Sequence, residues 1–507
     1  MAQQRLAKKL LLIGWDAADW QIIQPLLEQG LMPNMQRVIN NGVRGDIATI
    51  KPVLSPMLWN SIATGKRPDK HGILSFMEPD PDHQYVRPST STSRKVKAIW
   101  NILSQNDLTS QVIAWFAGHP AEPIRGCCVS EYFQKTVDDF DKPLPIKPGT
   151  FHPPELETEL APFRIHPAKL DGGTIETFVP NAAKINQEKD DRLGALAHIL
   201  AETASVHAAA TYLLKNKPWD FAAVYCLAID HFSHGFMPYH PPRRDIISNE
   251  DFDLYKDVVN GAYRWHDMML GQLLDLAGPE TVVVIVSDHG FYSDHRRPEY
   301  ISKEPAGAAV CHRPFGIICM SGPGIRKGGR IDGASILDVT PTLLTLFGLP
   351  VGQDMDGKVL LQAFEKPPAL EWINSWEDIP GNAGMHPPEK RQDPLEAQEA
   401  INQLVALGYI APLEEDKEKA VRHTILERQA NLAMVYADGG KFAEAISLLE
   451  TLVLELPNRI RLNLLLAQCY RHVGRRREAQ WIVEGVLVPY PLTPFALLQL
   501  AGGPQDC

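Results

Sequence analysis

The chain has 507 residues, of which 44% are hydrophobic, and its 50 basic and 61 acidic side chains give a formal net charge of −11. This length allows a large core with additional modules. The acidic balance argues against a general nucleic-acid-binding surface, so an anionic substrate would have to be attracted by a local site.

The first predicted element is a strand at residues 10–13, a short apolar run that ends before Asp16. Apolar residues at both alternate positions are typical of strands buried on both faces of a parallel sheet. Further on, Ser55 lies within residues 52–57 and is the candidate nucleophile. The chain contains no Gly-x-Ser-x-Gly elbow, so a hydrolase triad is not the simpler interpretation. A serine hydroxyl is a poor nucleophile at neutral pH, and coordination to a metal is one way to activate it.

The following stretch first continues the predicted core and then leaves it. Residues 96–103 have helical spacing, and residues 110–116 have the pattern of a strand. Residues from about 133 to 195 are rich in Pro, Lys, Asp and Glu and are weakly periodic. We interpret this segment as an inserted cap that selects substrates, with an ordinary surface excursion as the alternative.

A second predicted strand, residues 221–229, precedes Asp230 and His234. The spacing i, i+4 places this carboxylate and this imidazole on one face if the chain turns helically after the strand. His312 can complete a three-ligand set with them. His312 taken alone could equally be a packed or surface imidazole.

The third predicted strand, residues 281–286, precedes the adjacent Asp288 and His289. Together with Asp16 these residues can make a second three-ligand set. Taken singly, each aspartate after a strand could instead be a helix N-cap. Seven candidates in this order favour the metal interpretation.

The strands predict where these side chains meet, and the donor atoms predict which ions they bind. Open parallel sheets bind ligands at the carboxyl ends of their strands, so the three aspartates are expected in one crevice. Oxygen and imidazole ligands without a thiolate suit Zn²⁺, with Mn²⁺ or Fe as poorer matches. Two such ions about 4 Å apart can stabilise both the attacking and the leaving oxygen of an in-line displacement.

The C-terminal third predicts a different architecture. A Pro-rich stretch at residues 366–394 is expected to be a linker and packing arm, and residues 395–409 carry an apolar helical stripe. A 34-residue repeat follows, which resembles the tetratricopeptide repeat. It relates Ala433, Tyr436, Gly440, Ala445 and Pro457 to Ala467, Tyr470, Gly474, Ala479 and Pro491.

This module has two full repeats and a partial third at residues 494–501, fewer than usually stand alone. We therefore expect it to lean on the catalytic domain or on a neighbouring protomer. Binding of a peptide or protein partner is one reading of its function, and a helical buttress or dimer arm is the other.

These motifs together resemble the alkaline phosphatase superfamily, in the branch called type I phosphodiesterase/nucleotide pyrophosphatase. The resemblance spans about residues 8 to 362. Its matching segments are residues 13–16, Ser55 with residues 64–65 and 68–73, Asp230 with His234, residues 287–291, His312 before residues 322–325, residues 338–344 and residues 354–357.

The resemblance implies a role for each candidate. One metal would be held by Asp230, His234 and His312, and the other by Asp16, Asp288 and His289 together with the Ser55 alkoxide. Ser55 would attack phosphorus and form a phosphoseryl intermediate, which water would then hydrolyse.

Two positions depart from the family's pattern. Relatives of the eukaryotic type usually carry Thr as the nucleophile and, three residues later, an Asn that binds a phosphate oxygen, whereas this chain has Ser55 and Leu58. Asn60 or a backbone amide near Ser55 would have to supply that donor. The sulfatase branch is disfavoured, because its Cys/Ser-x-Pro-x-Arg modification motif is absent: Pro56 directly follows Ser55, and Trp59 stands where Arg is required.

The sequence thus predicts an α/β, alkaline-phosphatase-like fold with a mostly parallel sheet between helices. Its predicted parts are a catalytic domain at residues 1–365 with the cap at about 133–195, the linker at 366–394, and an all-α repeat domain at 395–507. The expected activity is two-metal hydrolysis of small-molecule phosphodiesters or pyrophosphates. The alternatives are a phosphomonoesterase or sulfatase-like hydrolase of the same superfamily and a scaffold with a non-catalytic phosphodiesterase-like domain.

The cellular setting is predicted from cysteines and apolar runs. Seven cysteines show no spacing typical of a disulfide framework or zinc knuckle. The apolar run at residues 10–15 is too short for the core of a signal peptide, and no run reaches membrane-spanning length. A cytoplasmic location is therefore expected, with a protein partner or self-association through the repeats.

Overall fold

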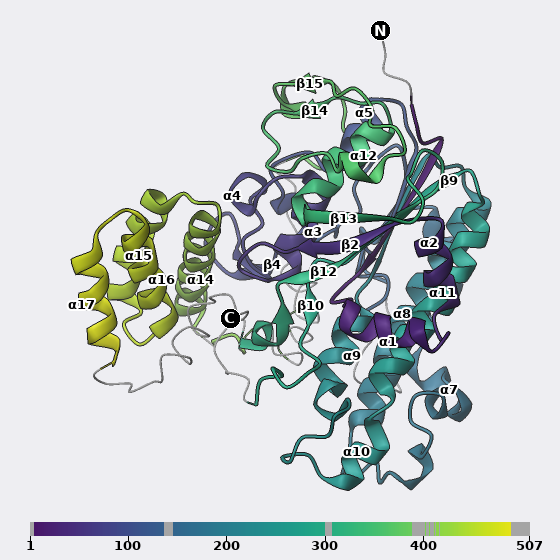
Figure 1. Cartoon of the computed structure of the whole chain (residues 1–507), viewed down its shortest axis with the longest axis horizontal. Helices are drawn as coiled ribbons and strands as arrows, with labels where there is room; N and C mark the ends of the chain where they lie inside the picture. The colour runs from purple at the N-terminus through teal and green to yellow at the C-terminus, as the bar shows by residue number, and fades with distance from the viewer. Residues whose placement is uncertain are drawn as a thin grey trace.

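A nine-stranded mixed sheet forms the centre of the computed structural model, which describes residues 5–135, 146–299, 307–387, 401, 405, 410, 412–414 and 416–487 (Figure 1). From one edge to the other the strands are β13 (Gly329–Ser335), β2 (Gly42–Ala48), β12 (Phe315–Ser321), β9 (Thr281–Val286), β1 (Lys9–Trp15), β8 (Phe221–Cys226), β5 (Ser110–Ile113), β6 (Gly126–Val129) and β7 (Phe151–His152). Among these described strands only β12 and β7 run against their neighbours, so the sheet is mostly parallel, as predicted.

The three strands predicted to carry aspartates are adjacent and parallel. β1 lies between β9 and β8, with Leu11 paired to Val283 on one side and to Ala222 on the other. The predicted run at 221–229 is divided, because β8 ends at Cys226 and Ala228 already begins a helix. β5 ends at Ile113, three residues before the predicted end at residue 116. The next residue, Ala114, adopts a positive φ of 56°, which is not strand geometry.

Helices cover both faces of the sheet and create two apolar cores. On one face lie α1 (Trp20–Glu28), α2 (Pro33–Asn40), α8 (Arg192–Asn216), α9 (Ala228–Phe236) and α11 (Val258–Ala277); on the other lie α3 (Ser55–Thr64), α5 (Ile99–Gln105) and α12 (Val339–Leu346). β1 contributes Leu11 and Ile13 to the first core and Leu10 and Leu12 to the second. This burial on both faces explains why its sequence is apolar without alternation.

The predicted cap at residues 133–195 is partly integrated into this core. Its strand β7 extends the main sheet beside β6, and its short helices α6 (Leu156–Leu160) and α7 (Gly172–Glu176) precede α8. Phe178 stacks on Phe232 of α9, with ring centroids 5.7 Å apart. Residues 136–145 lie outside the described residues, and selection of substrates by this segment stays a prediction.

The predicted linker at residues 366–394 is described as far as residue 387, and that part packs on the core. Its strand β15 (Trp372–Ile373) pairs with β14 (Val351–Gly352). The buried Lys97 donates hydrogen bonds to the carbonyl oxygens of Trp376 and Ile379, at 2.6 and 2.9 Å. This portion is therefore a packing arm.

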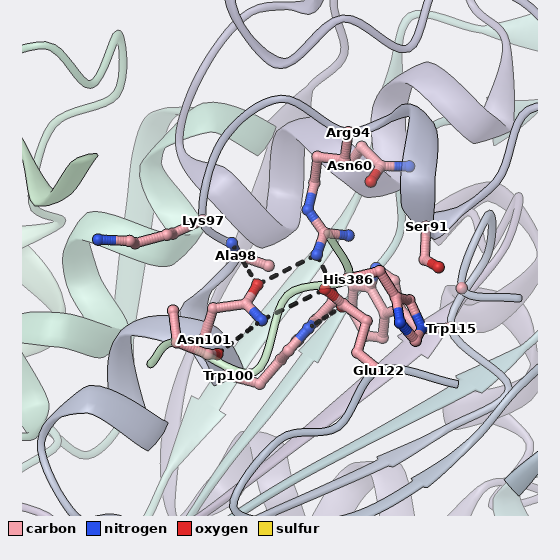
Figure 2. A network of polar contacts seen from close by, with 12 residues as sticks. Asn60, Ser91, Arg94, Lys97, Ala98, Trp100, Asn101, Trp115, Glu122 and His386 are labelled. Carbon is pink, nitrogen blue, oxygen red and sulfur yellow. Dashed lines mark hydrogen bonds and ion pairs between the residues drawn. The ribbon is translucent and has the colours of Figure 1, made fainter. Parts of the chain in front are cut away.

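A buried polar network anchors the same arm (Figure 2). Arg94 and Glu122 form an ion pair of 2.7 Å with side chains only 1% and 3% exposed. Trp100 donates to the same carboxylate at 2.7 Å, and the Asn101 amide donates to Glu122 at 3.3 Å and to the Ala383 carbonyl at 3.1 Å. Because the buried charges are paired and hydrogen-bonded, this network fixes the arm instead of forming an open site.

The C-terminal module is a lobe of helices beside the hairpin of β3 (Met77–Pro79) and β4 (Val86–Pro88) and the short helix α4 (Pro68–His71) (Figure 1). Its described helices are α14 (Lys417–Asp438), α15 (Phe442–Glu455), α16 (Ile460–His472) and α17 (Arg476–Leu487). Gly440 and Gly474, equivalent in the predicted repeat, both adopt a positive φ at the turns between paired helices, at 74° and 84°. The repeat's alanines are buried in one cluster. Most of residues 395–409, and the partial third repeat at 494–501, lie outside the described residues.

The module packs on the catalytic domain through α14. This is one of the two supports expected for it, the other being a neighbouring protomer. α14 contacts the hairpin strands β3 (Met77–Pro79) and β4 (Val86–Pro88) and the short helix α4 (Pro68–His71). Val421 and Val435 of α14 belong to one apolar cluster with Leu54 and Met57, which lie one residue before and two residues after Ser55. The module thus packs behind the segment that carries Ser55.

A buried carboxylate at this interface predicts a large stability effect. Glu78 in β3 is paired with Arg87 at 2.7 Å and with Arg428 of α14 at 3.4 Å, and all three side chains are at most 19% exposed. Glu78→Gln leaves the buried Arg87 and the half-buried Arg428 guanidinium groups without their carboxylate, so we expect the free energy of unfolding to fall by about 3 kcal/mol. Urea unfolding measures this change.

The matched control is Glu455→Gln, which removes the partner of Arg422 at a site where both side chains are well exposed, 67% and 42%. An exposed pair contributes little, so its unfolding curve should overlay that of the wild type. Equal curves for both variants would contradict a stabilising role for Glu78.

Candidate metal centre

Three neighbouring strand ends bring the predicted ligands together in two sets. Asp16 follows β1, the helix α9 with Asp230 and His234 follows β8, and Asp288 and His289 follow β9. His312 opens β11 (His312–Arg313), which pairs with β10 (Gly290–Phe291). In each set the ligand atoms lie within 4.8 Å of one another; the sets are Asp230, His234 and His312, and Asp16, Asp288 and His289.

The first set is built on the predicted helical spacing. Asp230 and His234 lie one turn apart in α9, and His234 Nε2 is 3.3 Å from Asp230 Oδ1. His312 Nε2 is 3.5 Å from the same oxygen and 3.0 Å from His234 Nε2. Because His312 Nδ1 faces the Val53 carbonyl oxygen at 3.3 Å, it carries a proton there and leaves Nε2 directed at the set.

The second set lies against the first. His289 Nε2 is 3.3 Å from Asp16 Oδ1 and 3.5 Å from Asp288 Oδ2. His289 Nδ1 lies 2.9 Å from the Gly290 carbonyl oxygen, to which it can donate, so its Nε2 is the ligating nitrogen. The rings of His289 and His312 stack with centroids 3.9 Å apart, which makes the two sets adjacent.

The electrostatics of the site call for a cation. Asp16, Asp230 and Asp288 are each fully buried. Burial and the negative charge of Asp16 raise the pKa of Asp288 well above its usual range. Although burial opposes it, the charges of Asp288 and Asp16 raise the pKa of His289 to about 10. Such a concentration of buried carboxylates is costly unless positive charge compensates it.

Unpartnered atoms mark where that cation fits. Within the described part of the chain, Asp16 Oδ1, Asp288 Oδ2, His289 Nε2 and Ser55 Oγ are buried and have no hydrogen-bond partner. Buried polar atoms are almost always hydrogen-bonded in folded proteins, so four such atoms of ligand type need an explanation. Oxygen and imidazole donors suit divalent cations, and the residues present fit a pair of such ions.

Two contacts place Ser55 at this centre. Val53, two residues before it, accepts the hydrogen bond from His312, and Trp59, one helical turn after it, donates from Nε1 to Asp16 Oδ2 at 2.9 Å. Ser55 is the first residue of α3, and Leu54 at the N-cap provides no side-chain hydrogen bond. Ser55 therefore lies at a helix N-terminus where Pro56 has no N–H and the N–H groups of Met57 and Leu58 donate to the Leu54 carbonyl oxygen, which leaves the Ser55 N–H as the donor for an anion.

The sequence did not identify the side chains that orient Asp16. Trp59 and Tyr225 both donate to Asp16 Oδ2, at 2.9 and 2.6 Å, which leaves Oδ1 facing the second set. Gly14 makes this possible, because a Cβ there would overlap the Trp59 indole. The spacing of Ser55 and Trp59, i and i+4, was the available signal that both side chains share one helix face.

Asn60, considered as the phosphate-oxygen donor, is placed elsewhere. Its amide donates to the carbonyl oxygens of Pro56 and Phe116, at 2.8 and 3.5 Å, and its side chain is fully buried. Of the backbone amides at the start of α3, the geometry leaves the N–H of Ser55 as the donor, because Pro56 has none and those of Met57 and Leu58 donate to Leu54.

Comparison with known proteins supplies the context for this site. The family model described as type I phosphodiesterase / nucleotide pyrophosphatase matches residues 10–300, and a tetratricopeptide repeat model matches residues 436–494. Human arylsulfatase K is 36% identical over 102 residues, which are 19% of this chain and 18% of that protein. The chain thus matches less than a fifth of the length of this relative.

Two solved structures of enzymes, a sulfatase and a nucleotide pyrophosphatase / phosphodiesterase, are similar to part of this chain. A 2-O GAG sulfatase matches with a TM-score of 0.43 and 14% identity, over 70% of this chain and 73% of its own. The human ectonucleotide pyrophosphatase / phosphodiesterase 5 matches with a TM-score of 0.37 and 13% identity, over 69% of this chain and 97% of its own. At these TM-scores neither match supports a conclusion about activity.

Proposed function

Because the chain belongs to the type I phosphodiesterase / nucleotide pyrophosphatase family and is a hydrolase of the alkaline phosphatase superfamily, we propose that it cleaves phosphodiester or pyrophosphate bonds of a small molecule. The proposed reaction proceeds through a phosphoseryl intermediate on Ser55. The observation that supports it most is the group of four buried, unpartnered ligand-type atoms that includes the Ser55 hydroxyl.

The metal ions would be held by the two three-residue sets. When bound, such ions lower the pKa of a coordinated hydroxyl and neutralise charge on phosphoryl oxygens. Trp59 and Tyr225 orient Asp16, the Gly290 carbonyl orients His289, and the Val53 carbonyl orients His312. Such outer hydrogen bonds fix the rings and carboxylates in the orientation that binding needs.

The residues of this chain then define the displacement. Ser55 Oγ loses its proton to solvent and forms a bond to phosphorus while the bond from phosphorus to the leaving oxygen breaks, and that oxygen takes up a proton from solvent. Water next attacks the phosphoserine, which releases phosphate or phosphate monoester and restores the Ser55 hydroxyl. The N-terminus of α3 faces the charge that develops on the phosphoryl oxygens.

Three chromogenic substrates test the proposal. Metal-free protein is reconstituted with Zn²⁺, Mn²⁺ or Fe²⁺ and assayed with bis-p-nitrophenyl phosphate, p-nitrophenyl phosphate and p-nitrophenyl sulfate. We expect the diester to have the highest kcat/KM. Faster turnover of the monoester or the sulfate would assign the protein to a sister branch. Bound metal without turnover of any substrate would favour the scaffold alternative.

The repeat module is proposed to add a protein interaction. Its tetratricopeptide similarity suggests binding of a partner or of a second copy, while α14 is already used against the catalytic domain. A pull-down that depends on residues 430–501 and is unaffected by Ser55→Ala would support an adaptor role separate from hydrolysis.

A cytoplasmic location is likewise proposed. The six cysteines of the described residues are free thiols, which favours a reducing compartment. In the part of the chain that the structure describes, no helix is both long and apolar enough to cross a membrane. Cell fractionation tests the location.

A further inference from the structure

The carboxylate of Asp19, which the proposed reaction does not use, connects three separate segments of the chain. Asp19 Oδ1 and Oδ2 accept hydrogen bonds from Arg313 Nη1, at 2.6 and 2.7 Å. Oδ2 also accepts from the backbone N–H of Phe291, at 3.1 Å. Asp19 is only 1% exposed, so this charge-assisted contact is shielded from solvent.

Each connected segment carries a candidate metal ligand. Asp19 lies three residues after Asp16 and is the N-cap of α1, where its Oδ1 accepts from Gln21 N at 2.8 Å. Phe291 lies two residues after His289 in β10. Arg313 directly follows His312 in β11, and Phe291 is paired with His312.

The approach of Asp19 to β10 depends on Gly290. A Cβ at this position would overlap Asp19 Oδ2 and the carbonyl oxygen of Phe315, both of which are too close for any side chain. Any larger residue must therefore displace either the carboxylate or β10. The position that follows His289 must therefore be occupied by glycine for Asp19 to reach β10.

Asp19 is itself held in place by a further contact of its backbone. Its backbone N–H donates to the hydroxyl of the fully buried Tyr263, at 3.1 Å. The backbone of Asp19 is therefore held by α11 and its carboxylate by the start of α1, while β10 and β11 are hydrogen-bonded to that carboxylate. The connection runs from a rigid helix to two two-residue strands that have little pairing of their own.

We propose that Asp19, through its ion pair with Arg313, is a positioning residue that sets the distance between the two metal-ligand sets. This inference rests on the proposed function. Asp16 belongs to one set and His312 to the other, and His289 lies between Asp16 and β10. Loss of the Asp19 carboxylate charge frees β11 to shift relative to β1, which weakens metal binding without removing any ligand.

Metal affinity of the full-length protein tests this role. Metal-free wild type, Asp19→Asn and Arg313→Gln are titrated with Zn²⁺ by calorimetry in a competing chelator, at a temperature where each is folded by circular dichroism. We expect each variant to bind Zn²⁺ about 10- to 100-fold more weakly than wild type. The double variant should be no weaker than either single variant, because both act through one ion pair.

The matched control is Asp332→Asn, which removes a carboxylate from an exposed pair with Arg330, with side chains 70% and 71% exposed. It should bind Zn²⁺ as the wild type does. A lower unfolding midpoint of the metal-free Asp19→Asn protein with unchanged Zn²⁺ affinity would assign Asp19 a purely structural role and overturn the proposal.

Two further outcomes keep this inference separate from the proposed function. If Asp19→Asn does not fold, Gly290→Ala and Arg313→Gln perturb the same contact from the other side, and normal Zn²⁺ affinity in both would overturn the positioning role. A wild-type protein that binds no Zn²⁺, Mn²⁺ or Fe²⁺ would overturn the two-metal function itself, whereas tight binding by wild type and variants alike would overturn only the inference.

Discussion

Ser55→Ala is expected to lower kcat/KM for the best phosphodiester by about 10⁴-fold or more while leaving metal binding largely intact. The change removes the proposed attacking oxygen, whereas the six aspartates and histidines of the candidate metal sites remain. Ser55 is buried and its hydroxyl has no hydrogen-bond partner among the described residues, so its loss should not destabilise the fold. Steady-state kinetics with parallel measurement of bound Zn²⁺ would show this separation.

Two substitutions serve as controls for Ser55→Ala. Ser55→Thr keeps a hydroxyl on the same carbon and should retain measurable turnover. Ser61→Ala alters the same helix at a hydroxyl that lies 3.0 Å from His71 Nε2, away from the ligands, and should keep the wild-type kcat. Full activity of Ser55→Ala would exclude Ser55 as the nucleophile.

Asp288→Asn is expected to change stability in opposite directions with and without metal. In the metal-free protein, two fully buried carboxylates, Asp16 and Asp288, repel one another, so removing one charge should raise the unfolding midpoint. In excess Zn²⁺ the order reverses, because the wild type gains binding free energy of about 2.7 kcal/mol at 100 times its Kd and the variant gains less. Hydrolysis should be lost in the variant. Differential scanning calorimetry in chelator and in Zn²⁺ measures both signs.

Asp338→Asn is the control for burial alone. Asp338 is 3% exposed and accepts hydrogen bonds from the backbone of Ser335 and Lys358, remote from the two ligand sets. This substitution should lower the midpoint in chelator and in Zn²⁺ alike. If Asp288→Asn behaves in the same way and retains hydrolysis, Asp288 is not a metal ligand.

Much of the candidate site could be predicted because its signals are local. Asp16, Asp230 and Asp288 each follow an apolar run, and adjacent parallel strands necessarily end at one edge of the sheet. The i, i+4 spacing of Asp230 and His234 specified one helix face, and α9 has that geometry. Their role as metal ligands stays a prediction that the experiments above address.

Other expectations failed where the backbone changed direction within an apolar run. The run at residues 221–229 contains both the end of β8 and the start of α9, and hydrophobicity alone does not separate them. Asn60 was a candidate donor by its distance from Ser55 along the chain. In the helix its amide instead reaches the carbonyl oxygen of Pro56, one turn earlier.

The sequence by itself determined the central parallel strands, the residue types at their ends, and the helical repeat, because each depends on neighbours within a few residues or on a fixed period. Only the tertiary structure decided which groups orient those ligands. Tyr225 reaches Asp16 across 209 positions of sequence, and Arg313 reaches Asp19 across 294. It also decided that α14 packs behind Ser55. Contacts of this kind leave no local periodicity, because they arise only when separate strands, helices and a second module pack together.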